Sequence, residues 1–285
     1  VINMSKIAAA LVKQLRDRTG VSMSKCKEAL ESANGDMDKS IEFLRKAGMT
    51  SSVKKEGRDA NEGLIGVGEE ESTLVLVEVN AETDFVAQNA KFKQFVQELI
   101  HQAILEKPAS VTELMQLPYV KDPSITLDQY RSLIVQSLGE NIQVKRLLIV
   151  PKSSDISIGF YSHMGGKIVS IVVLSEGKGH ESLARDIAMH VTAESPEYLS
   201  PEEVPAEVKA KEEEIARSQV QNKPPHIIDK IIEGKLEAYY MEMCLTCQKY
   251  VKDNSMTIAM LLEKESKEHK HPLKIQAFYR WKVGI

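Results

Sequence analysis

The sequence contains the stretch Glu78-Val79-Asn80-Ala81-Glu82-Thr83-Asp84-Phe85-Val86-Ala87-Gln88-Asn89. It joins an apolar strand, residues 73–79, to an amphipathic helix that begins near Lys91. Asp84 and Phe85 place a carboxylate beside a large aromatic ring in a short polar connection, and loops on a rigid scaffold often carry binding residues. The alternative is that Phe85 is a core residue, because it lies at helical spacing from Phe92.

A weak internal duplication surrounds this stretch. Each copy is strand, strand and helix: residues 63–67, 73–79 and 91–105, then 157–163, 167–174 and 180–193. Both copies carry an Ile-Gly-apolar triplet, Ile65-Gly66-Val67 and Ile158-Gly159-Phe160. The second copy has only residues 175–179 between its last strand and its helix, so it omits the segment with Thr83-Asp84-Phe85-Val86. A scaffold does not need that extra segment, which favours a functional role for it.

The first part of the chain predicts a separate module of three helices over residues 5–48. Its apolar residues recur at helical spacing, as in Ile7, Leu11 and Leu15. Asn34-Gly35 is a typical helix end, Asp36 can cap the third helix, and Gly48 is expected to end it. Residues 49–62 are polar and predict a linker.

The remainder predicts an α+β core of two subdomains, residues 63–150 and 151–285. Within the second, residues 205–240 predict a projecting helical hairpin whose helices turn at Asn222-Lys223-Pro224-Pro225. Its second helix carries an apolar stripe, Ile228, Ile231 and Ile232, that needs a partner.

Two further elements complete the prediction for this subdomain. Asp253-Asn254-Ser255 is expected to cap a helix over residues 256–263. Residues 274–283 alternate apolar and polar side chains, which predicts a closing strand.

Composition narrows the classes of function. The formal net charge is −4, which argues against sequence-independent nucleic-acid binding, because such proteins present many cations on one face. No apolar run is long enough for a membrane span. Three cysteines in a chain of 285 residues predict a reduced, cytoplasmic protein.

Motifs for catalysis or cofactor binding are weak. No Walker loop is present, and Gly177-Lys178-Gly179-His180 is interpreted as a plain turn rather than an anion site. Cys244 and Cys247 have the spacing of a redox or zinc motif without a second ligand pair, so a structural role is preferred. The sequence therefore predicts no metal, no cofactor and no catalytic residues.

Several motifs resemble the elongation factor Ts family. They are residues 11–21, Cys26-Lys27-Glu28-Ala29-Leu30, residues 78–86, Asp186-Ile187-Ala188-Met189-His190-Val191 and Tyr250-Val251-Lys252-Asp253. The resemblance runs nearly end to end. It implies a ubiquitin-associated-like (UBA-like) three-helix module, a two-subdomain core, and a helical hairpin that forms homodimers in some members.

The resemblance also implies an activity, guanine-nucleotide exchange on the translation GTPase elongation factor Tu. The GDP-bound and nucleotide-free forms of that GTPase are the implied partners. Thr83, Asp84, Phe85 and Val86 would contact the GTPase domain and disturb its Mg²⁺ site. Further candidate contacts are Lys13, Arg16, Met23 and His163.

The main alternative from another class is an adaptor whose UBA-like module binds a peptide while the core is a scaffold. A weaker alternative is a zinc or redox enzyme that uses Cys244 and Cys247. Two departures from the family pattern also matter. Some members have a further C-terminal helical module, whereas this sequence stops at Ile285, so the contacts of that module are not expected here. In addition, the hairpin turn contains Asn222-Lys223-Pro224-Pro225 where a Gly-Lys-Pro pattern is expected, and Cys247 is unusual at its position.

Overall fold

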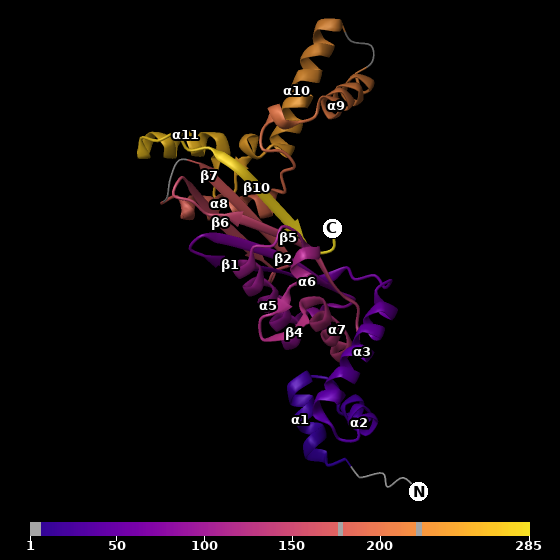
Figure 1. Ribbon diagram of the computed structural model, residues 1–285. Coiled ribbons are helices and arrows are strands. Elements are labelled where there is room, and N and C mark those ends of the chain that lie inside the picture. Colours follow the sequence, from indigo (N-terminus) through magenta and orange to yellow (C-terminus); the bar gives the residue numbers. More distant parts are fainter. Residues whose placement is uncertain (1–6, 176–178, 221–223) are drawn as a thin grey trace. The chain divides into compact units, whose positions relative to one another are not determined.

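The computed structural model describes residues 7–175, 179–220 and 224–285, and their mixture of helices and sheets confirms the predicted α+β class (Figure 1). The α-helices are α1 (Ala9–Thr19), α2 (Met23–Ser32), α3 (Met37–Lys55), α4 (Asp84–Gln88), α5 (Ala90–Glu106), α6 (Val111–Gln116), α7 (Leu127–Leu138), α8 (Glu181–Glu194), α9 (Ala206–Ser218), α10 (Pro225–Met243) and α11 (Ile258–His269). The strands are β1 (Glu62–Glu70), β2 (Thr73–Ala81), β3 (Pro118–Tyr119), β4 (Asp122–Thr126), β5 (Ile142–Pro151), β6 (Ile156–His163), β7 (Ile168–Ser175), β8 (Lys249–Tyr250), β9 (Asp253–Thr257) and β10 (Ile275–Lys282). The chain forms two compact units, Val1–Pro151 with Lys282–Ile285, and Lys152–Trp281.

Helices α1, α2 and α3 share a small core of their own at the start of the first unit. It is built from apolar residues one helical turn apart: Val12, Leu15, Val21, Cys26, Ala29, Leu30 and Leu44. Gly20 ends α1 in the left-handed conformation at φ 69°, and Asp36 caps α3 by accepting from the Lys39 amide at 3.0 Å. The predicted cap and helix periodicity are therefore confirmed for these three helices.

The prediction that Gly48 ends the third helix is wrong, because α3 continues to Lys55. A side chain at Gly48 would place its Cβ 3.4 Å from the Ser132 carbonyl oxygen of α7. Gly48 thus lies inside α3, on the side that packs against α7, and it is not a helix stop. Residues 49–55, expected in the linker, are therefore the last part of α3.

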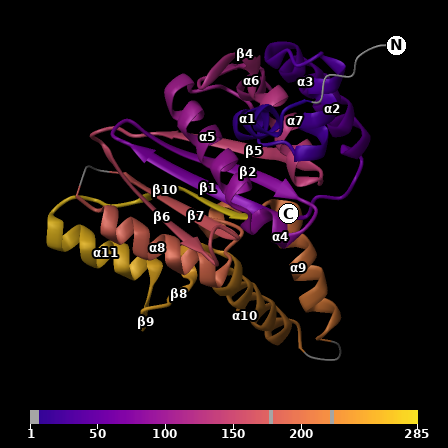
Figure 2. The ribbon, with the colours of Figure 1, turned by 90° about the horizontal axis from the view of Figure 1, so that it is seen from below.

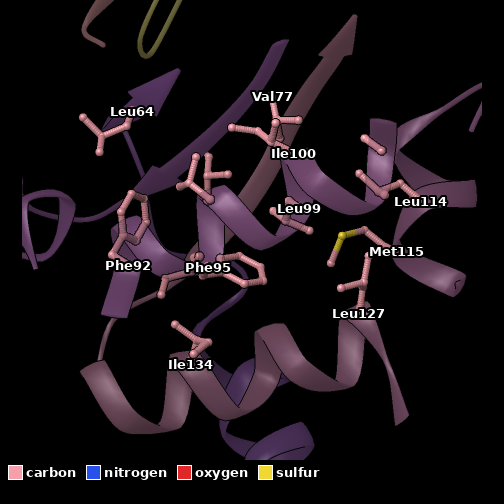
Figure 3. Close-up of a cluster of buried hydrophobic side chains, with 14 of the residues drawn as sticks. Leu64, Val77, Phe92, Phe95, Leu99, Ile100, Leu114, Met115, Leu127 and Ile134 are labelled. Carbon is pink, nitrogen blue, oxygen red and sulfur yellow. The ribbon is translucent and has the colours of Figure 1, made fainter. Parts of the chain in front are cut away.

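The first unit contains a sheet in the order β1-β2-β5, with helices α5, α6 and α7 on one face. Alternate residues of β2, including Val77, point to these helices, as the period of two requires. Figure 3 shows side chains of this core from the sheet and the three helices: Leu64, Val77, Phe92, Phe95, Leu99, Ile100, Leu114, Met115, Leu127 and Ile134.

The second unit repeats the arrangement as a sheet in the order β6-β7-β10, with α8 and α11 packed on it (Figure 2). The shared triplets have a packing reason. A Cβ at Gly66 would lie 2.4 Å from Ile100 of α5, and one at Gly159 would lie 2.1 Å from the Arg185 amide of α8. In both copies the glycine lets a helix approach its sheet.

The duplication extends further than the sequence predicted. Hairpin β3–β4 pairs Pro118 with Thr126 and Tyr119 with Asp122. Hairpin β8–β9 repeats this with Lys249↔Thr257 and Tyr250↔Asp253. The expected cap Asp253-Asn254-Ser255 is therefore wrong: these residues belong to β9, and Thr257 caps α11 by accepting from the Met260 amide at 3.2 Å.

Helices α9 and α10 form the predicted helical hairpin within the second unit (Figure 1). Ala216 and Ile232 are buried, whereas Ile215 is 41% exposed. Asn222 and Lys223 of the predicted turn lie outside the described residues. Among the described helices, none combines the length and the apolar character that a membrane span requires.

Candidate functional site

Phe85 projects from the first turn of α4 and is 84% exposed. The interpretation of Phe85 as a core residue is therefore wrong. Its neighbours anchor the short helix instead, since Ala87 is fully buried and Val86 packs against the core of the first unit. Thr83 caps α4 by accepting a hydrogen bond from the Val86 amide at 3.4 Å.

A break in the helix explains why the spacing between Phe85 and Phe92 is misleading. Asn89 is extended, at φ −66° and ψ 138°, so it ends α4 and caps α5 by accepting from the Lys91 amide at 2.9 Å. The helical phase is lost at this residue. Phe92 then faces the core with no exposed surface, while Phe85 faces solvent.

Two acids, Glu82 and Glu140, form hydrogen bonds that hold the segment just before Phe85. We call Glu82, Thr83, Glu140 and Asn141 the clamp. Glu140 accepts from the Thr83 hydroxyl at 2.6 Å and from the Thr83 amide at 3.0 Å. In return, Glu82 accepts from the Asn141 amide at 2.6 Å. Each segment thus satisfies a backbone N–H of the other with a charged acceptor, the stronger class of hydrogen bond.

The register of the sheet produces the clamp. Strands β2 and β5 are antiparallel and end with Ala81 opposite Ile142. Continuing that register by two residues places Glu82 against Asn141 and Thr83 against Glu140. Gly139 ends α7 in the left-handed conformation, at φ 85°. The chain therefore turns there, and Glu140 lies just before the start of β5.

The segment after α3 is tied to the same place. The side-chain amide of Asn141, which is almost fully buried, donates to the Arg58 carbonyl at 2.8 Å and to the Glu56 carbonyl at 3.3 Å. Arg58 also lies 3.4 Å from Glu82 in a surface ion pair. The clamp therefore joins three chain segments at the start of the segment that carries the exposed Phe85.

Charges of both signs surround the clamp. Burial lowers the pKa of Lys55, and the nearby cations Lys25 and Arg58 lower it further, while Glu82 and Glu140 oppose the shift. Asp84 is exposed, and no ion pair to it is found within the described part of the chain. The site thus presents the exposed ring of Phe85 and the exposed carboxylate of Asp84, and cations lie near the clamp.

The other predicted contacts of the first unit lie on the helical module. Lys13 and Arg16 are exposed on α1, and Met23 is 40% exposed at the start of α2. The turn between these helices is held to the core, because the Gly20 carbonyl accepts from Lys91 Nζ at 2.5 Å and from Ser137 Oγ at 2.7 Å. Lys91 belongs to α5, which directly follows α4.

The remaining candidates lie in the second unit. His163 is exposed at the end of β6, with its Nδ1 atom 3.5 Å from the Tyr161 hydroxyl. Cys244 is buried after α10, and desolvation raises the pKa of its thiol to about 11, which favours the unreactive protonated form. Gly177 and Lys178, interpreted as part of a plain turn, lie outside the described residues.

Sequence inspection missed Glu140, Asn141 and Arg58 as parts of the site. The available signal was the pairing of the strand before Glu82 with the strand after Asn141. That pairing is a contact between distant segments, which local patterns do not specify.

Comparison with known proteins agrees with the motifs. A sequence profile of a family described as "Elongation factor TS" matches residues 82–285. Proteins named "Elongation factor Ts" are similar over 281 residues, which is 99% of this chain and 100% of each relative: 51% identical in Protochlamydia amoebophila, 43% in Chlamydia felis and 42% in Chlamydia muridarum. The chain therefore belongs to the elongation factor Ts family.

Proposed function

We propose that this chain is a guanine-nucleotide exchange factor for the translation GTPase elongation factor Tu and acts in the cytoplasm. It binds the GDP form, displaces Mg²⁺ and promotes release of GDP, so that GTP can rebind. The observation that carries the proposal is the 84% exposure of Phe85 on a segment that the clamp holds in place. A large apolar ring held in water on an ordered segment gains free energy when a partner buries it.

The chemistry of the partner site explains how such a ring can act. Mg²⁺ requires near-ideal octahedral geometry, so a small shift of the groups that hold it weakens its binding. Mg²⁺ and the GDP phosphates attract each other, and loss of one loosens the other. The exchange factor stabilises the nucleotide-free GTPase by a coupling free energy and does not carry out a chemical reaction.

The energy required is within reach of a few contacts. Each tenfold gain in the release rate needs ~1.4 kcal/mol off the barrier. Burial of one phenylalanine side chain contributes ~1.5–3 kcal/mol. Phe85 alone can therefore account for about one to two powers of ten in rate, with Asp84 and the helical module contributing further contacts.

The test is release of fluorescently labelled GDP from purified elongation factor Tu, followed in real time after adding excess unlabelled GDP. The full chain should accelerate release in proportion to its concentration until the partner is saturated. Binding of the two proteins without any acceleration would overturn the proposal and favour the adaptor, in which the UBA-like module binds a peptide and the core is a scaffold.

A further inference from the structure

We propose that Glu140 is a positioning residue for exchange: it presents Phe85 to the partner by bracing Thr83, without touching the partner itself. The inference rests on the proposed function for its activity readout. Glu140 is half-buried, and both of its carboxylate oxygens are used on one residue, Oε1 by the Thr83 hydroxyl at 2.6 Å and Oε2 by the Thr83 amide at 3.0 Å.

The need for a brace follows from the size of α4. The helix has five residues, too few to be stable by its own hydrogen bonds. Its orientation depends on Thr83 at the N-cap and on the burial of Ala87. The Thr83 hydroxyl donates to Glu140 and accepts from the Val86 amide, so Glu140 also fixes the hydroxyl that caps the helix.

The clamp makes the brace reciprocal. Glu82 accepts from the Asn141 amide, and the Asn141 side chain donates to the Arg58 and Glu56 carbonyls. The turn that carries Glu140 is therefore held from two sides and can act as a fixed point. A rigid support is what a binding residue needs, because a small loss of order at the contact lowers the rate strongly.

The free protein provides a readout that does not depend on exchange activity. Hydrogen exchange of the Thr83 amide reports local opening of the brace, and removing its acceptor with Glu140→Ala should speed exchange by about tenfold or more. Glu140→Gln keeps a carbonyl oxygen for the Thr83 amide, so it should restore most of the protection. The melting temperature should change little in either variant.

The activity readout is the release of labelled GDP from elongation factor Tu. With Glu140→Ala the maximal release rate should fall about tenfold, more than the concentration for half-maximal effect rises, because the other contact surfaces are intact. Glu140→Gln should recover most of the rate. The matched control is Glu113→Ala, since Glu113 accepts from the Ala109 amide at 2.8 Å in another loop, and this variant should leave release unchanged.

A second variant covers the case in which Glu140→Ala lowers the melting temperature. Thr83→Val keeps the side-chain shape and removes only the hydroxyl. It should slow release in the same direction. The loss in the double variant should be smaller than the sum of the two single losses, because both variants remove the hydrogen bond from the Thr83 hydroxyl to Glu140.

The outcomes separate the inference from the proposed function. Unchanged hydrogen exchange at Thr83 in Glu140→Ala, or additive losses in the double variant, would overturn the role of Glu140. Equal loss of rate in Glu140→Gln and Glu140→Ala would also overturn it. If the unmodified chain does not accelerate GDP release from elongation factor Tu, the proposed exchange function fails. Hydrogen exchange of the Thr83 amide in the free protein still decides whether Glu140 braces Thr83.

Discussion

Thr83 and Glu140 are 57 residues apart in the sequence, yet the Thr83 hydroxyl donates to Glu140 Oε1 at 2.6 Å. The antiparallel pairing of β2 with β5 brings them together, and the turn after α7 orients the acid. The consequence is an ordered support for an exposed aromatic residue two positions later. This relationship between the end of two paired strands and a short helix is the basis of the predictions about exchange.

Replacing Phe85 with alanine should leave the stability of the free protein almost unchanged, because the side chain is 84% exposed. Release of GDP from elongation factor Tu should slow by about tenfold or more, since the transition state loses a buried aromatic contact. Phe92→Ala is the matched control: that side chain is fully buried, so its loss should cost ~3–5 kcal/mol of unfolding free energy. A large drop in melting temperature for Phe85→Ala, with exchange per folded molecule unchanged, would contradict the assignment.

Asp84→Ala should slow release in the same direction but less than Phe85→Ala. The carboxylate is exposed in the free protein, so its removal costs little stability, and in the complex it would lose charge-assisted hydrogen bonds or repulsion near the metal site. Release rates measured at several Mg²⁺ concentrations check this. Asp84→Asn, which keeps the shape and removes the charge, should behave like the alanine variant if charge is what matters.

Met23→Ala should weaken complex formation, because Met23 is 40% exposed on the helical module near the turn that Lys91 and Ser137 hold. Loss of a buried methionine contact corresponds to ~1–2 kcal/mol, or about a fivefold to thirtyfold rise in Kd. Titration calorimetry with elongation factor Tu measures this. Met49 is 45% exposed on α3, and Met49→Ala is the control that should keep the Kd. If Met23→Ala and Met49→Ala bind elongation factor Tu with the same Kd, Met23 is not part of the contact surface.

The hairpin of α9 and α10 should mediate self-association. Ile215 is 41% exposed and Ile227 is 37% exposed, and burying these apolar side chains against a second copy would stabilise a dimer. Light scattering should detect a dimer, and Ile215→Asp combined with Ile227→Asp should convert it to a monomer. Val53→Asp is the control, since Val53 is 70% exposed on α3 and outside the hairpin. A monomer at all concentrations for the unmodified chain would contradict the dimer.

Stability should fall as the pH drops below about 6.5, in part because of His190. Burial lowers the pKa of His190 below its ordinary value of 6.5, against the raising effects of Gln248 and Glu194. Its Nδ1 atom accepts from the Val251 amide at 3.2 Å, so a proton there would remove the acceptor. The unfolded chain therefore takes up a proton before the folded chain does, and the stabilisation present above pH 6.5 is lost as the pH falls.

Urea unfolding at pH 5, 6 and 7 measures this dependence. His190→Asn keeps an acceptor for the Val251 amide and does not titrate, so its unfolding free energy should change less with pH than that of the unmodified chain. His101 is exposed on α5, and His101→Asn should preserve the original slope. Identical slopes for all three proteins would show that His190 does not contribute.

Much of this protein could be predicted from local pattern. Apolar residues one helical turn apart predict α1, α2 and α3, and alternation predicts β10, because each pattern places a continuous apolar face on one element. The duplication was visible because Gly66 and Gly159 recur at the same point of each copy. The motif around Phe85 was visible because it interrupts one copy and is absent from the other.

Tertiary packing decided the features that depend on distant residues. Gly48 looks like a helix end, yet it lies inside α3, on the side that packs against α7. Phe85 and Phe92 share helical spacing, yet the extended Asn89 between them separates their faces. The partnership of Thr83 with Glu140 exists only once β2 and β5 adopt their register. Periodicity describes one element at a time, whereas register and exposure are set by which segments pack together, and that selection involves the whole fold.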